Sequence, residues 1–186
     1  MIGVAQNNLC LDIFFQFCYM YSFNSAQCSH GIVSEAGCPG VADPGAQIAA
    51  EAHKLGIRVV PLVGPSSILL ALMASGMDGQ HFRFCGYLPI KEPARTNAIK
   101  DLERKSASSE GETQLFIETP YRNSGMLADL VKNCAPTTLI LAATDISGPE
   151  ERIRTFSAAD WKKQDLSLPK LPTVFGILGA KRARRA

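Results

Sequence analysis

The stretch TQLFIETPYRNSGMLADLVKNCAPTTLILAA, residues 113–143, decides the fold class. Its first six residues are a short run with apolar Leu115, Phe116 and Ile117 in succession, and they predict a strand. A helix is predicted next, because Met126, Leu127, Leu130 and Val131 recur at helical spacing on one face. Residues 137–143 are apolar and rich in β-branched side chains, as a strand buried on both faces is. The stretch therefore predicts a strand, a helix and a second strand.

The same alternation continues in both directions along the chain. Further helices are predicted at residues 44–55, 65–76 and 93–105, and further strands at residues 57–62, 82–88, 153–156 and 172–178. Strands and helices that alternate at this spacing are typical of an α/β fold, and they predict a largely parallel sheet. The gap near Asp78–Gln80 is the predicted domain boundary.

Composition excludes several classes of protein. The 186 residues are 46% hydrophobic and 19% charged, which argues against a disordered chain. No apolar run approaches the roughly 20 residues of a membrane-spanning helix. The six cysteines form no C-x-x-C pair and the three histidines share no ligand spacing, so neither a disulfide scaffold nor a metal site is expected. Four of the last six residues are basic and the rest of the chain is slightly acidic, so no nucleic-acid footprint is spread over the surface.

The first thirty residues differ from the rest of the chain. They contain a single charged residue, Asp12, and six of the fourteen aromatic residues. Aromatic side chains alternate with other residues from Phe15 to Phe23, and this spacing is compatible with a strand.

Three loops contain more glycine, proline, serine or charged residues than a simple turn requires. Residues 34–45 (SEAGCPGVADPG) form either a tight crossover or a loop whose amides approach a ligand. Ser66 and Ser67 either cap the following helix or contact a small polar ligand. Glu118 and Arg122, directly after a predicted buried strand, form either a structural ion pair or a site acid with its charge partner.

Taken together, these loops resemble a known family. Five blocks occur in its order and spacing: SEAGCPGVADPG (34–45), VVPLVGPSS (59–67), FRFCGYLPI (82–90), FIETPYRN (116–123) and DISGPEE (145–151). They resemble the tetrapyrrole (corrin/porphyrin) methylase superfamily, and within it the branch of ribosomal RNA small subunit methyltransferase I, which methylates a ribose 2′-hydroxyl.

The resemblance implies two αβα domains, the N-terminal one incomplete. Residues 31–78 correspond to the later part of the N-terminal domain and residues 80–178 to the C-terminal domain. Residues 1–30 are then an unmatched segment, and residues 179–186 are a basic tail.

The resemblance also implies a cofactor, S-adenosylmethionine, bound without a metal and usually by a homodimer. The implied cofactor-binding residues are Glu35, Ala36, Gly37, Cys38, Ser66, Ser67 and Thr119, and the catalytic candidates are Glu118, Arg122 and Glu151. The role of general base stays open between Glu118 and Glu151.

Two departures from the family pattern leave the methyl acceptor open. The lysine of an E-L-T-K-type motif is absent from Asp145-Ile146-Ser147-Gly148, and Tyr121 replaces the histidine of P-H-R. The leading hypothesis is a cytoplasmic methyltransferase that acts on ribosomal RNA. The alternatives are a non-catalytic remnant that serves as a dimerising module, and a methyltransferase acting on a tetrapyrrole or another small molecule.

Overall fold

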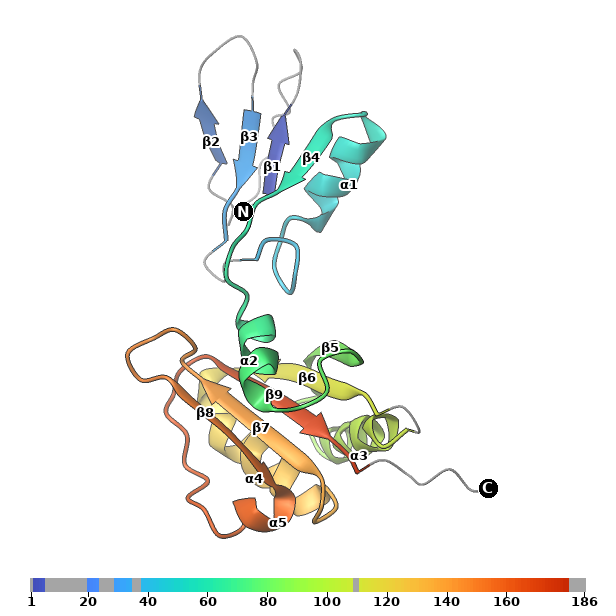
Figure 1. Cartoon of the computed structure of the whole chain (residues 1–186), viewed down its shortest axis with the longest axis vertical. Helices are drawn as coiled ribbons and strands as arrows, with labels where there is room; N and C mark the ends of the chain where they lie inside the picture. The colour runs from blue at the N-terminus through green and yellow to red at the C-terminus, as the bar shows by residue number, and fades with distance from the viewer. Residues whose placement is uncertain (1, 6–19, 24–28, 35–37, 109–110, 181–186) are drawn as a thin grey trace. The chain divides into compact units, whose positions relative to one another are not determined.

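The computed structural model describes residues 2–5, 20–23, 29–34, 38–108 and 111–180, which form two compact units, Met1–Ser67 and Ile68–Ala186 (Figure 1). The helices and strands alternate along much of the chain, so the predicted α/β class is confirmed. No helix within these residues combines the length and apolar character that crossing a membrane requires.

The first unit is built on a four-stranded sheet. Its strands are β1 (Ile2–Ala5), β2 (Met20–Phe23), β3 (Ser29–Ile32) and β4 (Arg58–Pro61), in the order β2-β3-β1-β4 with every pair antiparallel. β2 lies within the stretch whose alternation is compatible with a strand, and residues 15–19 of that stretch are outside the described residues.

Helix α1 (Ala46–Lys54) precedes β4 and begins two residues later than predicted. Gly45 at its start has a φ of +136°, a conformation that glycine adopts without steric cost. Ala52 of α1 packs with Ile57 and Val59, which joins the helix to the strand that follows it.

The second unit is built on a five-stranded sheet. Its strands are β5 (Phe82–Tyr87), β6 (Thr113–Glu118), β7 (Leu139–Thr144), β8 (Arg152–Ser157) and β9 (Thr173–Leu178), in the order β5-β6-β9-β7-β8. Only β5 and β6 pair in parallel among these strands, and the other three pairs are antiparallel.

The prediction of a largely parallel sheet is therefore wrong, and the connections explain why. Helix α3 (Ala94–Ser106) crosses over between β5 and β6, which gives the parallel pair. β7 and β8 are instead joined by the short loop 145–151, which closes an antiparallel hairpin. β9 then inserts between β6 and β7 and runs against both. The spacing of apolar residues predicts the individual helices and strands. The position of β9 between β6 and β7 depends instead on contacts between distant parts of the chain.

Helices cover both faces of this sheet. Helices α3, α4 (Asn123–Asn133) and α5 (Ala158–Trp161) pack on one face, against Phe116, Ile140 and Phe175. Helix α2 (Ser67–Ser75) packs on the other face, against Leu115, Leu141, Ala143 and Val174. Neighbouring residues such as Leu115 and Phe116 thus serve opposite faces, as the period of two along a strand dictates. This three-layer packing explains why the inner strands β7 (LILAAT) and β9 (TVFGIL) are apolar at most positions.

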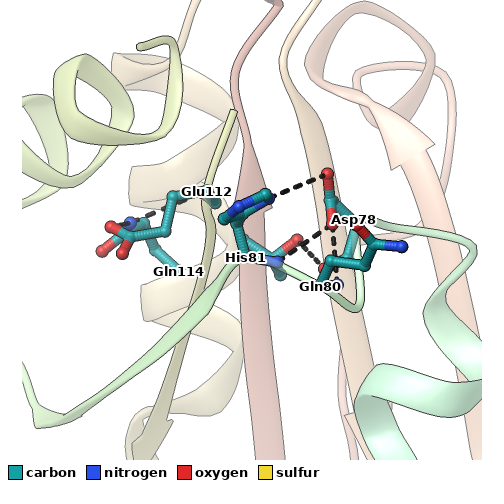
Figure 2. Close-up of polar contacts among 6 residues, drawn as sticks. Asp78, Gln80, His81, Glu112 and Gln114 are labelled. Carbon is teal, nitrogen blue, oxygen red and sulfur yellow. Dashed lines mark hydrogen bonds and ion pairs between the residues drawn. The ribbon is translucent and has the colours of Figure 1, made fainter. Parts of the chain in front are cut away.

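The start of the parallel pair is held by a turn that follows α2. One carboxylate oxygen of Asp78 accepts the backbone N–H groups of Gln80 (2.8 Å) and His81 (3.1 Å), and Thr113 Oγ1 donates to the Asp78 carbonyl (2.8 Å). Figure 2 shows this cluster beside the neighbouring contact of Glu112 with Gln114. Asp78 therefore connects the amino ends of β5 and β6. The loops that follow the two strands begin at the opposite, carboxyl ends. The domain boundary near Asp78–Gln80 stays a prediction.

Candidate functional site

An open pocket lies where the parallel strands β5 and β6 end. Its volume is about 500 Å³, and it is lined by Tyr87, Leu88, Pro89, Ile90, Thr119 and Arg122. The volume falls within the range of small-molecule sites. The carboxyl ends of neighbouring parallel strands are also where ligands bind in open α/β sheets. The location and the size of the pocket make it the candidate site of this unit.

A bulge in β5 shapes one side of the pocket. The register of β5 against β6 shifts between Phe84 and Tyr87, and Gly86 within that interval has a φ of +68°. Glycine at such a position lets a strand bend without steric strain. The bulge lies directly before Tyr87, the last residue of β5, and Tyr87 is 61% exposed and lines the pocket.

The opposite side is organised by an ion pair. Glu118 ends β6, and Arg122 ends the short 3₁₀ helix η1 (Pro120–Arg122). Arg122 Nη2 lies 2.6 Å from Glu118 Oε1, which also accepts the Thr119 N–H at 2.6 Å. The Glu118 side chain is 1% exposed and that of Arg122 is 33% exposed. The sequence left open whether Glu118 and Arg122 form a structural ion pair or a site acid with its charge partner. The observed ion pair is compatible with both, because it fixes the loop and also places the Arg122 cation at the pocket.

Arg122 keeps one hydrogen-bond donor unused. Its Nε–H is buried and has no acceptor within the described part of the chain. A buried N–H without a partner is costly, so such a group is relieved when a ligand brings an acceptor to it. Since Arg122 lines the pocket, this donor is the feature of the site that most directly favours a polar or anionic ligand group.

The ion pair is fully ionised near neutral pH. Burial works against the charged form of Glu118, but hydrogen bonds from Arg122 and from the Thr119 N–H, together with the positive charge of Arg122, outweigh burial and lower the Glu118 pKa below its ordinary value of 4.5. The hydrogen bond to Glu118 raises the Arg122 pKa in turn. Both shifts favour the same ion pair.

This shift predicts how stability depends on pH. A carboxyl with a lowered folded-state pKa stabilises the fold above its unfolded-state pKa, and that contribution is lost as pH falls through the folded-state pKa. We expect the unfolding free energy of the wild type to fall below about pH 4.5, and Glu118→Gln to lose this part of the dependence. Urea unfolding between pH 3 and pH 7 measures it. Identical pH profiles for the two proteins would contradict the assignment.

The apolar wall of the pocket is anchored from α3. Arg95 Nη1 donates to the Ile90 carbonyl at 3.2 Å, and Arg95 Nη2 lies 2.7 Å from Asp129 Oδ2 on α4. Arg95 therefore ties the loop after β5 to the helix that follows Arg122. The loop after β5 and the segment around Arg122 are thus both connected to the layer formed by α3 and α4.

Glu151 has a different environment. It lies in the loop between β7 and β8, where its Oε2 accepts the Ser147 N–H at 2.7 Å. Asp145 accepts the Glu150 N–H at 2.8 Å, and a Cβ atom at Gly148 would collide with the Asp145 carboxyl group. The loop is thus held by its own carboxylates, and Glu151 is one of the groups that close it.

The two candidate acids lie at the same edge of the sheet but not together. Glu118 pairs with Thr173, Thr173 with Thr144, and Thr144 with Arg152, the neighbour of Glu151. Three strand spacings of about 4.8 Å each put the Cα atoms of Glu118 and Arg152 roughly 14 Å apart. Each carboxylate is held by its own contacts, that of Glu118 by Arg122 and that of Glu151 by the Ser147 N–H, so the two acids belong to separate groups of side chains.

The other candidates come from the first unit or its boundary. Ser66 is buried just before α2, and Ser67 is exposed as the first residue of that helix. Cys38 is half-buried, while Glu35, Ala36 and Gly37 lie outside the described residues. Within the second unit, the structure thus brings together Glu118, Thr119 and Arg122.

The residues of the apolar wall, Tyr87 to Ile90, were not predicted from the sequence to be site residues. Its signal was present, because the block FRFCGYLPI is one of the five that carry the family resemblance. Within the described residues, no group of three or more His, Cys, Asp or Glu side chains is placed to hold a metal ion.

The chain is similar to curated proteins of one kind. It is 30% identical over 158 residues to a ribosomal RNA small subunit methyltransferase I of Vibrio cholerae, a match that covers 83% of this chain and 53% of that protein. The corresponding protein of Escherichia coli O157:H7 is 31% identical over 153 residues, covering 81% and 52%. The chain spans about half the length of the curated relatives it matches. No family model matches it.

A solved structure shares the fold. The crystal structure of the methyltransferase CobJ matches with a TM-score of 0.51 at 23% identity, and the match covers 81% of this chain and 64% of that one. At this identity the likeness supports the fold alone.

Proposed function

Since the chain is a relative of the ribosomal RNA small subunit methyltransferase I proteins, we propose that it takes part in methyl transfer from S-adenosylmethionine to small-subunit ribosomal RNA. The observation that carries this proposal is the pocket at the ends of β5 and β6, with Arg122 beside an apolar wall. The reaction class, methyl transfer, is inferred from the relatives, and the pocket is the proposed binding place of S-adenosylmethionine.

The residues of the pocket fit this cofactor. Tyr87, Leu88 and Ile90 offer an apolar surface to an adenosyl group, and the unpaired Arg122 Nε–H offers a donor to a carboxylate. Thr119 adds a polar side chain on the same side. When bound, the cofactor supplies an activated methyl group, so the protein needs neither a metal nor a covalent nucleophile for the transfer.

What the chain contributes is then mainly orientation and exclusion of water. Glu118 is a poor candidate for the general base, because its pKa lies below the ordinary value and an effective base has a pKa near the working pH. We propose that Glu118 instead holds Arg122 in place through their 2.6 Å contact. The Glu151 carboxylate closes its own loop, and we propose a positioning role for that loop as well.

We propose, on the strength of the resemblance, that the protein acts as a homodimer on the small ribosomal subunit in the cytoplasm. The residues proposed to contact the cofactor from the first unit are those named from the sequence, Cys38, Ser66 and Ser67 among them.

Calorimetric titration with S-adenosylmethionine tests the proposal. We expect saturable binding by the wild type and by Lys163→Gln, a control at an exposed position that does not line the pocket. Tritium transfer from labelled cofactor to small ribosomal subunits, compared with transfer to tetrapyrrole precursors, then identifies the acceptor. No heat at millimolar cofactor would favour a non-catalytic module, and labelling of the tetrapyrrole alone would replace RNA as the acceptor.

A further inference from the structure

We propose that Tyr121 and Lys170 form a stacking site for an unpaired base of an RNA strand at the edge of the pocket. This inference rests on the proposed function, because it assigns part of the RNA substrate to named residues. It concerns side chains that neither line the pocket nor belong to the candidate cofactor-binding set.

The first observation is the exposure of an aromatic ring beside the site. Tyr121 is 82% exposed, more than Tyr87 or Phe82. It is the middle residue of η1, directly before Arg122, whose side chain lines the pocket. Tyr121 is thus flanked closely in sequence by two lining residues of the pocket, Thr119 and Arg122.

The second observation is a cation placed on that ring. Lys170 Nζ lies 5.3 Å from the centre of the Tyr121 ring, within the range of a cation–π contact. Lys170 comes from the loop between α5 and β9, and no carboxylate in the described part of the chain forms an ion pair with it. Its positive charge is thus available to a phosphate next to the ring.

The backbone that carries Tyr121 is rigidly held. The Arg122 N–H donates to the Thr119 carbonyl at 2.9 Å, and Glu118 binds both the Thr119 N–H and the Arg122 side chain. A tyrosine has only two side-chain torsions to immobilise, so a ring on such a turn is ordered by a ligand at low entropic cost.

These features favour a nucleic-acid base over a protein surface. Protein hot spots are clusters of apolar and aromatic anchors in a desolvated pocket. Tyr121 is instead a single exposed ring with one cation, Lys170, placed over it. Proteins that bind single-stranded nucleic acid combine positive charge along the backbone path with aromatic rings on which bases stack.

Fluorescence anisotropy with a labelled single-stranded RNA of small-subunit sequence tests the proposal. We expect Tyr121→Ala to weaken binding by about 5- to 150-fold, the range that corresponds to losing one stacked base. Tyr121→Phe keeps the ring and should bind like the wild type. Lys170→Gln should weaken binding and reduce the slope of log affinity against log salt by roughly 0.7, the value for one lost phosphate contact to a single strand.

Further binding measurements distinguish a failure of the stacking site from a failure of the proposed function. Tyr121→Ala should leave duplex RNA binding and S-adenosylmethionine binding unchanged, since neither uses this ring. If the wild type binds no cofactor, the proposed function fails. If the wild type binds cofactor and RNA while Tyr121→Ala binds RNA equally well, the stacking site is wrong. The stacking site is also overturned if the variant loses cofactor binding instead, or if the wild type binds cofactor but no RNA.

Discussion

Replacing Arg122 by alanine is expected to lower S-adenosylmethionine affinity by on the order of tenfold or more, and to destabilise the fold near neutral pH. The affinity falls because Arg122 is the cation of the pocket and holds its unused Nε–H donor. The fold is destabilised because Glu118, whose side chain is 1% exposed, then keeps a buried charge that has lost its cation and retains only the Thr119 N–H. Titration calorimetry and urea unfolding measure the two effects.

The pH dependence of this variant is a second signature. Without Arg122, burial of the Glu118 carboxyl is opposed by the Thr119 N–H alone, so the Glu118 pKa should rise. The Arg122→Ala protein should therefore lose less stability, relative to the wild type, as the pH falls and Glu118 takes up a proton. Adding Glu118→Gln to Arg122→Ala should restore stability at neutral pH without restoring cofactor binding.

Arg122→Lys is the matched control. It keeps the positive charge near Glu118, so most of the stability should remain, but lysine has no equivalent of the Nε–H donor. We expect weakened cofactor binding in a folded protein. Cofactor affinity equal to that of the wild type in both Arg122 variants would show that the pocket is not the cofactor site.

Replacing Phe175 by alanine is expected to reduce the unfolding free energy by about 3–5 kcal/mol, a large share of the 5–15 kcal/mol of an ordinary domain. Phe175 is fully buried on β9, the middle strand of the sheet, and its ring stacks on Phe116 with the ring centres 5.6 Å apart. Its removal leaves a cavity between the sheet and the α3–α4 layer, which the neighbours fill only in part.

The chain contains its own probe for this measurement. Trp161 is its single tryptophan, it is fully buried, and it belongs to the same core as Phe175. Tryptophan fluorescence during urea unfolding therefore follows the second unit. Phe82→Ala on the edge strand, where the side chain is 40% exposed, is the control and should cost far less. A loss below about 1 kcal/mol in Phe175→Ala would contradict the assigned core, since core truncations of this size cost more.

The elements of the second unit were largely predictable from the sequence. The predicted strand 113–118 matches β6, and the predicted helix 93–105 is displaced by one residue from α3. Local periodicity decides such elements, because the side chains that must be buried recur at the spacing of a helix or a strand. The direction and order of the strands were not predictable, since they depend on the insertion of β9 between β6 and β7.

The candidate site was predictable in part. Glu118 and Arg122 were identified from their place directly after a predicted buried strand, and the structure shows that they form an ion pair. The wall from Tyr87 to Ile90 was not identified. It becomes part of the site through the register shift of β5 against β6 at Gly86 and through Arg95, which joins the Ile90 carbonyl to Asp129. Both depend on partners, β6 and Asp129, that lie tens of residues away in sequence.

By itself, the sequence determined the α/β class, the family resemblance and the residues that carry charge at the end of β6. Three features follow from tertiary packing instead: the sheet is mixed, two strands lie between β6, which ends at Glu118, and β8, which begins directly after Glu151, and Tyr87 lines the same pocket as Arg122. The physical reason is the range of the interactions. Propensity and periodicity act within one turn or one strand, whereas strand order and pocket walls are set by packing among segments tens of residues apart.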